Sequence, residues 1–358
     1  MAISNFIHRT GAQRIVFGNG TRHTIADEAR LAGIGRAMVI STPEQAGSAA
    51  QIATLLADRC GIRFPYARMH TPVTITEEAV ALAAHHDVDG VVAVGGGSAI
   101  GLSKAIALRT DLTQIVVPTT YSGSEMTDIV GQTSGGTKET MRDPRILPEV
   151  VVYDVELTTT LPAIASITSG ANALAHAIEG LYAQDTNPLL AVIAEEGIRA
   201  LGVALPRVSA SLTDTAARSE ALYGSWLCGT VLGATSMALH HKLCHVLGGA
   251  FDLPHAETHA VLLPHTIAYN APAAPEAIAR VGRALAAGDV PSRLYDLVRD
   301  GGAPTSLRAL GLSDNALEQA TDLALRNPYW NPRPLERDGI RALLDDAWHG
   351  RRPRSTTA

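Results

Sequence analysis

Cysteine is scarce in this chain of 358 residues, which contains only Cys60, Cys228 and Cys244. An odd number of widely separated cysteines excludes a disulfide framework and a CxxC redox pair. Positive charge is also in deficit, because the formal net charge is −6. The chain therefore lacks the basic field that holds a nucleic acid backbone. We expect a cytoplasmic protein without a nucleic acid partner.

Long apolar runs are scarce as well. The N-terminal residues reach Arg9 and Arg14 before an apolar run could form, so we expect no secretory signal. One uncharged stretch, Ala221 to Leu239, approaches the length of a membrane span. It is rich in Gly, Ser, Thr and Ala rather than Leu, Ile and Val, which favours a buried helix. We therefore expect no membrane partner.

Two kinds of pattern divide the chain. Short β-branched runs at 37–40, 90–94, 114–117 and 150–153 are typical of buried parallel strands separated by helices. From Leu161 onward, segments with helical periodicity replace them, at 163–183, 189–205, 215–247, 275–287 and 315–325. We predict an α/β plus all-α protein. A Rossmann-like, doubly wound parallel-sheet domain covers residues 1–158, and an all-helical domain covers residues 159–358.

A glycine turn follows the run 90–94. Gly95, Gly96 and Gly97 with Ser98 stand between this run and a helix-like segment. Glycines at such a turn let backbone N–H groups approach a diphosphate, and the helix N-terminus favours its negative charge. The spacing is not the GxGxxG fingerprint, and a tight turn that needs positive φ would also explain the glycines. Both interpretations stay open at this point.

Hydroxyl-bearing residues follow the next run, 114–117. Thr119, Thr120 and Ser122 stand where the neighbouring strand would end. Ligands of open α/β sheets bind at this edge, so we predict that both loops bind one dinucleotide. Thr42 stands where an acidic residue would bind the adenosine ribose of NAD. A neutral residue there leaves room for a 2′-phosphate, and we predict NADH or NADPH as the cofactor.

Histidine is concentrated in one segment, with six of 13 between residues 240 and 265, namely His240, His241, His245, His255, His259 and His265. His241 and His245 are spaced i,i+4, as are Asn172 and His176, so each pair projects from one helix face. Gathered imidazoles predict either a metal site or a pocket that transfers protons and stabilises an oxyanion. For any one histidine alone, a structural role in a helical core is the alternative.

These motifs together resemble the iron-containing alcohol dehydrogenase superfamily along the whole chain. The matching features are the GGGS turn, the PTT segment, a [D/N]-x3-H helix and H-x3-H-x9-H. The resemblance implies a dehydroquinate synthase-like architecture with an active site in the cleft between the two domains. It also implies that the family's metal ligands, one aspartate and three histidines, correspond to Asn172, His176, His241 and His255. His245 corresponds to a further histidine close to the substrate.

Two positions depart from the family pattern. Asn172 replaces the aspartate ligand, and Gly101 stands where many members have an aspartate. With the segments 121–127, 135–138, 142–148 and 327–334, these departures resemble the maleylacetate reductase branch. Its members reduce the double bond of maleylacetate to give 3-oxoadipate in aromatic compound degradation. Loss of the carboxylate weakens a metal site, although three imidazoles can still hold zinc. We expect a vestigial pocket that needs no divalent metal.

In that reaction, negative charge develops on the ketone oxygen as hydride reaches the alkene carbon β to it. Donors preorganised at this oxygen lower the barrier. We predict His245 as the donor or proton relay, supported by His241 and His176. His255 would complete the pocket, and Asn172 can donate an amide N–H where an aspartate could not.

The implied substrate is a dicarboxylate, so cationic side chains are expected at its ends. The candidates are Arg326, Arg333, Lys138 and Arg142, together with Tyr121. For Lys138, a contact with the cofactor is the alternative, and we predict it as a cofactor-binding residue. For each cation, a solvated surface position is the alternative. A homodimer is implied by the resemblance alone.

Three other functions stay open. A metal-dependent alcohol or lactaldehyde-type dehydrogenase of the same superfamily would need the ligand that Asn172 replaces. A lyase like dehydroquinate synthase would use bound NAD without consuming NADPH. A non-catalytic NAD-binding protein would leave the convergent histidines unexplained.

Overall fold

The computed structural model describes His8 and residues 11–134, 137–327 and 329–353. The chain divides into two compact units, one of Thr10–Leu161 and one of Met1–Arg9 with Pro162–Ala358. The helical unit therefore starts at Pro162, close to the predicted boundary. His8, which we predicted in the α/β domain, instead lies in the helical unit, where its Nδ1 is 3.5 Å from Nδ2 of Asn187.

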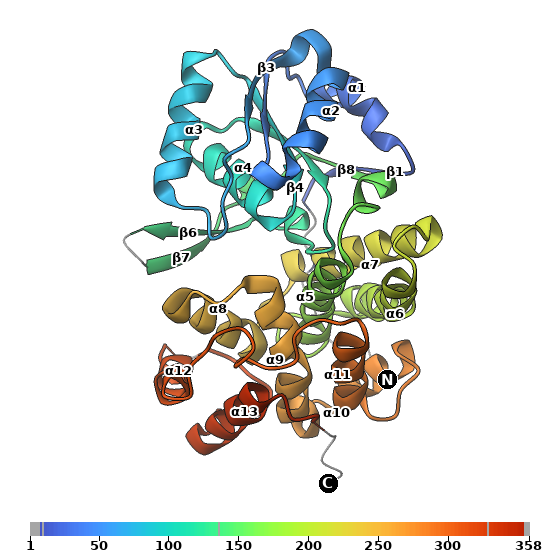
Figure 1. Ribbon diagram of the computed structural model, residues 1–358, viewed down its shortest axis with the longest axis vertical. Helices are drawn as coiled ribbons and strands as arrows, with labels where there is room; N and C mark the ends of the chain where they lie inside the picture. Colours follow the sequence, from blue (N-terminus) through green and yellow to red (C-terminus); the bar gives the residue numbers. More distant parts are fainter. Residues whose placement is uncertain (1–7, 9–10, 135–136, 328, 354–358) are drawn as a thin grey trace. The chain divides into compact units, whose positions relative to one another are not determined.

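A six-stranded parallel sheet forms the centre of the α/β unit, in the order β1-β8-β5-β4-β2-β3 (Figure 1). The strands are β1 (Arg14–Gly18), β2 (Ala37–Ile40), β3 (Cys60–Phe64), β4 (Gly90–Gly95), β5 (Thr113–Pro118) and β8 (Val150–Asp154). All four predicted runs are strands. Strands β1 and β3 were not predicted; they form the two edges of the sheet and are only partly buried.

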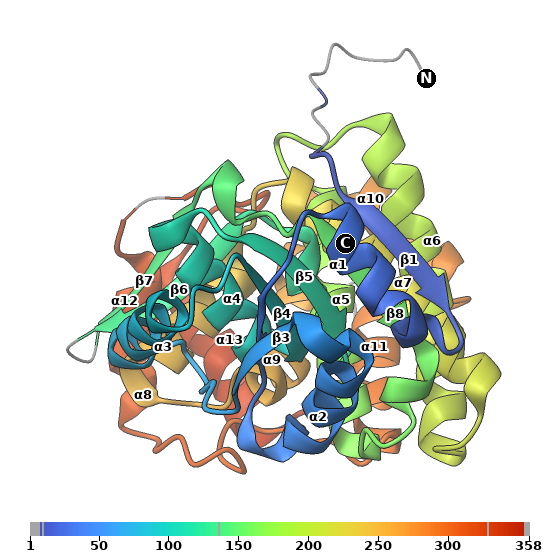
Figure 2. The ribbon, with the colours of Figure 1, turned by 90° about the horizontal axis from the view of Figure 1, so that it is seen from above.

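Helices cover both faces of this sheet. Alternate strand residues such as Val39 and Val92 pack with α1 (Ile25–Leu31) and α2 (Ala46–Leu56). Their neighbours Met38 and Val91 pack with α3 (Val73–His85) and α4 (Gly97–Thr110), so the strands separate two helical layers (Figure 2). The predicted doubly wound arrangement is confirmed. A separate antiparallel pair, β6 (Ile129–Ser134) and β7 (Thr137–Arg142), was not predicted.

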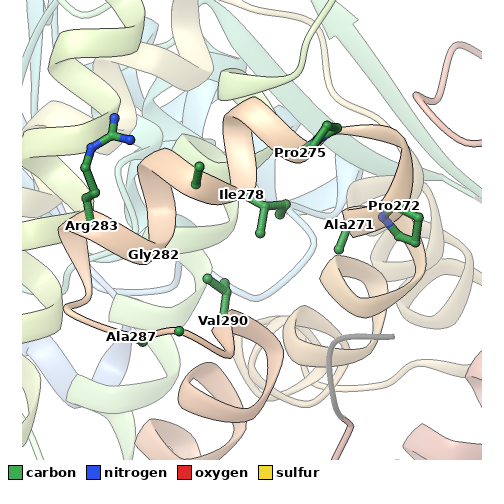
Figure 3. A pocket seen from close by; sticks show the side chains of 10 residues that line it. Ala271, Pro272, Pro275, Ile278, Gly282, Arg283, Ala287 and Val290 are labelled. Atoms are coloured by element: carbon green, nitrogen blue, oxygen red, sulfur yellow. The ribbon is translucent and has the colours of Figure 1, made fainter. Parts of the chain in front are cut away.

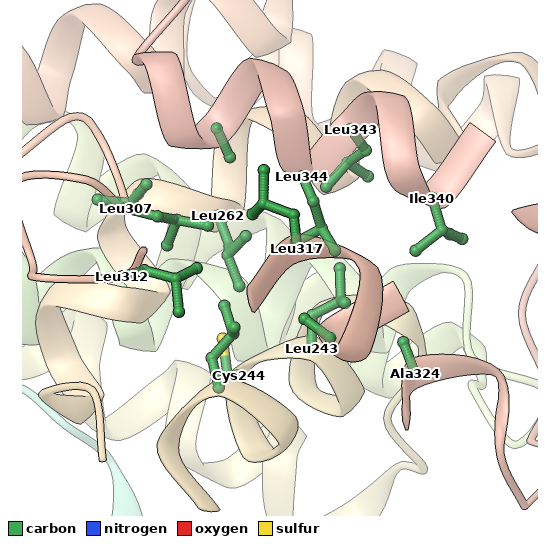
Figure 4. Close-up of a cluster of buried hydrophobic side chains, with 14 of the residues drawn as sticks. Leu243, Cys244, Leu262, Leu307, Leu312, Leu317, Ala324, Ile340, Leu343 and Leu344 are labelled. Atoms are coloured by element: carbon green, nitrogen blue, oxygen red, sulfur yellow. The ribbon is translucent and has the colours of Figure 1, made fainter. Parts of the chain in front are cut away.

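The second unit is helical. Its helices are α5 (Ala163–Leu181), α6 (Pro188–Ala210), α7 (Thr215–Ala234), α8 (Leu239–Phe251), α9 (His255–Asn270), α10 (Pro275–Ala284), α11 (Val290–Asp300), α12 (Ala316–Leu325) and α13 (Arg337–His349). Helix α5 is buried along almost its whole length and packs against α6, α7 and α9. The apolar cluster of Figure 4 joins α8, α9, α12 and α13.

The predicted segment 215–247 is two helices rather than one. Helix α7 ends at Ala234, and α8 begins at Leu239 after an extended Thr235. The uncharged stretch from Ala221 to Leu239 therefore does not form one continuous helix. Among the described helices, none is long and apolar enough to cross a membrane.

Candidate active site

The glycine turn between β4 and α4 has both properties that the sequence left open. Gly95 adopts a φ of +146°, which other residues rarely adopt. Gly97 is the first residue of α4, and a Cβ added to it would meet no described atom within 4 Å. The first N–H groups of a helix have no acceptor within the helix. The backbone at Gly97 and Ser98 can therefore be approached by an anion such as a diphosphate.

The hydroxyl-rich loop after β5 lies against this turn. Thr119 donates its backbone N–H to the Gly95 carbonyl at 3.1 Å, and a Cβ on Gly96 would lie 2.8 Å from Cγ2 of Thr120. The Thr119 hydroxyl is buried without a hydrogen-bond partner in the described chain. The hydroxyls of Thr120 and Ser122 are 3.5 Å apart. The fold thus brings together the two loops that were predicted to share one cofactor.

A carboxylate that the sequence analysis missed lies beside Thr42. Thr42 precedes the short 3-10 helix Pro43–Gln45, and its hydroxyl is hydrogen-bonded to the Glu44 carboxylate. The backbone N–H of Glu44 itself, and then this hydroxyl, lower the pKa of Glu44. The loop after β2 is therefore acidic, although position 42 is neutral. From the sequence, only Thr42 was considered in this loop.

Two further predicted positions and one departure are found in the same unit. Tyr121 is fully buried, which leaves a substrate no exposed surface of this side chain, so its role stays a prediction. Lys138 belongs to β7, and its side chain lies outside the described residues. At Gly101, a Cβ would lie 2.6 Å from the hydroxyl oxygen of Thr71. Thr71 thus occupies the space into which an aspartate at position 101 would project.

In the helical unit, a chain of hydrogen bonds links two of the predicted histidines to a buried carboxylate. His241 Nδ1 is 2.6 Å from Oε2 of Glu179, and His241 Nε2 is 2.8 Å from Nδ1 of His176. A carboxylate accepts, so neutral His241 carries its proton on Nδ1 and accepts at Nε2 from His176. Asn172, one turn before His176 on α5, has a buried side-chain oxygen with no hydrogen-bond partner among the described residues.

A second chain of the same kind runs beside the first. His240 Nδ1 is 3.0 Å from the Thr266 hydroxyl, and His240 Nε2 is 2.9 Å from Nδ1 of His259. Thr266 donates to the backbone carbonyls of its own helix, so it accepts from His240, which in turn accepts from His259. Burial lowers the pKa values of His240 and His259 well below the usual range, so both imidazoles are neutral.

The remaining two predicted histidines are the accessible ones. His245 is exposed, and His255, the first residue of α9, is half-buried. Their rings are nearly parallel, at 19° with centroids 6.5 Å apart. The buried His259 ring makes an edge contact with the His255 ring at 4.5 Å and with the His241 ring at 5.1 Å. The accessible rings of His245 and His255 therefore pack against the two sets of hydrogen-bonded histidines, through His241 and His259.

Glu179 fixes the helix that carries these groups. Its carboxylate accepts the backbone N–H groups of Ala238, His240 and His241 at 3.0, 2.8 and 3.4 Å, and so caps the N-terminus of α8. Neither Glu179 nor the hydrogen-bonded pair of His240 and His259 was predicted as part of the site. Glu179 lies one turn after His176 on α5, and this i,i+3 spacing is the signal that could have found it.

The predicted cationic residues have other partners or stay at the surface. The Arg333 guanidinium stacks 4.2 Å from the Tyr269 ring centroid and donates to the Tyr269 carbonyl at 3.0 Å. Arg142 pairs with Asp128 at 3.1 Å. Arg326 is exposed at the end of α12. Their contact with a substrate stays a prediction.

A cavity elsewhere in the helical unit contains none of the predicted residues (Figure 3). It has a volume of about 560 Å³ and is lined by α10 and its flanking loops, including Ile278, Val290 and Arg283. Arg283 pairs with Glu195 at 3.1 Å. This cavity gives no reason to move the candidate site away from the histidines.

Two family profiles match this chain. The profile described as iron-containing alcohol dehydrogenase matches residues 12–155, and that of the C-terminal part of the Fe-containing alcohol dehydrogenase family matches residues 166–348. The chain belongs to this family. Its members are oxidoreductases, and this chain is an enzyme of that class.

Within this family, the chain is similar to maleylacetate reductases. A maleylacetate reductase from a Rhizobium species is 55% identical, over 97% of this chain and 99% of the relative, and one from Burkholderia cepacia is 52% identical over the same shares. The crystal structure of maleylacetate reductase from Agrobacterium tumefaciens is 54% identical, with a TM-score of 0.94 over 98% of this chain and all of that chain. The predicted relationship and fold class are confirmed.

The family takes its name from iron, so the comparisons do not support our expectation that no metal is required. The side chains themselves fit a divalent ion poorly. The corresponding set of Asn172, His176, His241 and His255 contains no carboxylate, and His176 and His241 hydrogen-bond to each other. This hydrogen bond uses the Nε2 lone pair of His241 that a metal would take, although the Glu179 carboxylate on Nδ1 holds His241 in the tautomer that a metal ligand needs.

Proposed function

We propose that this chain is a maleylacetate reductase, which reduces the carbon–carbon double bond of maleylacetate to give 3-oxoadipate at the expense of NADH or NADPH. The observation that carries this proposal is the 55% identity, over 97% of the chain, to a relative of that name. The geometry of the two units supports it, because one fits a dinucleotide and the other presents ordered imidazoles.

The α/β unit would bind the cofactor. The backbone of Gly97 and Ser98 would face the diphosphate, and the hydroxyls of Thr119, Thr120 and Ser122 would donate to its oxygens. When bound, the nicotinamide ring supplies the hydride for the double bond. The open space at Gly97 and the buried, unpartnered hydroxyl of Thr119 are the features that fit such a ligand.

The histidines would stabilise the charge that reduction creates. An alkene conjugated to a ketone accumulates negative charge on the ketone oxygen when hydride adds at the β carbon, and a fixed N–H donor lowers that barrier. His245 is suited to this role because it is exposed and stands one turn after His241. His255 would complete the accessible pair, while Asn172, His176 and His241 would order the pocket beneath.

We propose further that the reaction requires no divalent metal. Asn172 is neutral, and the hydrogen bond of 2.8 Å from His176 uses the Nε2 lone pair of His241 that a metal would take. The imidazoles themselves then supply the electrostatic stabilisation. In the same proposal, the partners are a small dicarboxylate contacted by Arg326 and Arg333, and a second copy of the chain in a cytoplasmic homodimer.

The proposal is tested by following nicotinamide absorbance with maleylacetate as substrate, using NADH and NADPH in parallel. We expect stoichiometric oxidation of the cofactor and formation of 3-oxoadipate. Primary alcohols with NAD⁺ are the comparison. Turnover of alcohols without turnover of maleylacetate would favour a metal-dependent alcohol dehydrogenase and overturn the proposal.

A further inference from the structure

Lys104 is a charged side chain without exposed surface. It belongs to α4, two helical turns after Gly97. Burial lowers the pKa of its ammonium to about 7, while the nearby carboxylates of Glu125 and Asp128 act in the opposite direction. An ammonium is kept in a protein interior only where specific partners compensate its lost hydration. Its partners therefore indicate what it does.

All three partners of Lys104 belong to one short segment. Nζ donates to the Ser124 carbonyl at 2.6 Å, to the Thr127 hydroxyl at 2.9 Å and to the Ile129 carbonyl at 3.0 Å. The Thr127 hydroxyl donates to the Ser124 carbonyl at 3.1 Å, so it accepts from the lysine. Three acceptors use all three N–H groups of an ammonium, whereas a neutral amine has only two.

Other elements hold the same segment from different directions. The Tyr153 hydroxyl of β8 donates to Oε1 of the fully buried Glu125 at 2.8 Å. The side-chain amide of Gln13 donates to the Glu125 backbone carbonyl at 3.1 Å. The segment from Ser124 to Ile129 is thus fixed by residues of α4 and β8 and by Gln13, which directly precedes β1.

This segment continues directly from the hydroxyl-rich loop. Thr119 and Thr120 lie against the glycine turn at one end of that loop, and Ser124 is held by Lys104 at the other. Helix α4 therefore contributes to the cofactor region twice. Its N-terminus presents backbone N–H groups, and its third turn carries the side chain that anchors the opposite loop.

We propose that Lys104 is a positioning residue for the dinucleotide, because it anchors the loop whose hydroxyls face the glycine turn. The inference rests on the proposed nicotinamide cofactor. Lys104 is buried beneath the loop and acts through it, so its loss weakens cofactor binding and leaves the reacting groups in place. This predicts an effect on cofactor affinity rather than on turnover at saturation.

The first test compares two neighbouring changes in α4. Lys104→Met keeps a long side chain and removes all three N–H donors. Ser103→Ala removes a buried hydroxyl whose hydrogen bond of 2.9 Å goes to the Gln114 side chain and not to the loop. NADH binding is measured by nicotinamide fluorescence on the full-length protein. We expect the Kd of Lys104→Met to rise about tenfold or more and that of Ser103→Ala to change less than about twofold. The kcat at saturating NADH and the KM for maleylacetate stay near those of the unmodified protein.

A matched pair at Thr127 tests the same contact from the loop. Thr127→Val is nearly isosteric but has no hydroxyl, whereas Thr127→Ser keeps it. We expect Thr127→Val to raise the Kd for NADH by about three- to tenfold and Thr127→Ser to restore it. This pair decides the question if Lys104→Met does not fold.

The outcomes separate the two proposals. An unmodified protein that binds neither NADH nor NADPH contradicts the proposed function, and the inference falls with it. An unmodified protein that binds NADH, with folded Lys104→Met or Thr127→Val variants of lower Tm but unchanged Kd, leaves the function standing and overturns the role of Lys104. An equal rise in the Kd for NADH in Ser103→Ala and Lys104→Met would also overturn it, because it would show that Lys104 only contributes to the packing of the core.

Discussion

The two units of this chain present their functional groups in opposite ways. In the α/β unit, the binding groups are backbone N–H groups made accessible by the absence of a side chain at Gly97. In the helical unit, they are imidazoles ordered by other side chains, such as His241 by Glu179. The first site should be damaged by adding atoms, and the second by removing them. The variants that follow test this difference.

Removal of the His245 side chain should have the largest effect. If its imidazole stabilises the developing negative charge, His245→Ala should lower kcat and kcat/KM together by about a hundredfold or more. The Kd for NADH should stay near its original value. Steady-state kinetics and a fluorescence titration on one preparation measure both quantities.

The exposure of His245 makes this variant informative, because truncation of an exposed side chain seldom changes stability by more than about 0.5 kcal/mol. Tm is the control. A folded His245→Ala protein with unchanged kcat would remove this residue from the mechanism.

Addition of a side chain at Gly97 should weaken cofactor binding, whereas removal of the His245 side chain should leave it unchanged. Gly97→Val meets no described protein atom at its Cβ, so the fold should tolerate it, but the added atoms stand where the diphosphate would approach. We expect the Kd values for NADH and NADPH to rise together by about tenfold or more. Gly288→Val, at a loop glycine with equally open space, is the matched control. Equal cofactor affinity in both variants would contradict the assignment of the glycine turn.

The buried histidines predict a pH dependence of stability in the helical unit. Burial lowers the pKa of His265 from 6.5 to about 4. Between these two pH values the unfolded chain binds a proton at His265 more readily than the folded chain does. The full free energy of unfolding is therefore present above pH 6.5, and part of it is lost as the pH falls towards 4. Urea unfolding at about pH 7 and pH 5 should differ by about 2 kcal/mol through this residue. His265→Gln should reduce the difference, and an unchanged difference would show that His265 is not its source.

The smallest kinetic effect is expected at Glu44. Its carboxylate lies beside Thr42, in the loop predicted to meet the adenosine ribose, and should repel a 2′-phosphate. Glu44→Gln should raise kcat/KM for NADPH about three- to tenfold and leave that for NADH nearly unchanged, because only NADPH carries this charge. Equal changes with both cofactors would argue against a contact with the ribose.

Much of the α/β unit could be predicted from local sequence. A buried parallel strand is a short run of apolar residues, and a glycine turn directly follows it, as β4 and Gly95 illustrate. The edge strand β1 was not predicted because its apolar run, Ile15 to Phe17, is only three residues long. The Glu44 carboxylate escaped because its hydrogen bond to Thr42 depends on the turn that follows β2.

The helical unit was harder to predict in detail. Helical periodicity gave the segment 215–247 but not its break, since α8 is capped by Glu179, 59 residues before Ala238. The tautomers of the histidines could not be predicted for the same reason, because they depend on partners that are distant in the sequence. Spacing indicated that His241 and His245 share a helix face, but only the folded chain reveals that Thr266 orders His240 and His259.

In the proposed function, ordered imidazoles stabilise the charge formed during reduction without a divalent metal. The most direct test is the steady-state rate of NADH oxidation with maleylacetate after exhaustive chelation, with metal content measured on the same sample. We predict that the chelated, metal-free protein keeps most of its kcat and that added zinc or iron does not raise it. Loss of activity on chelation, with recovery on addition of zinc or iron, would contradict the claim.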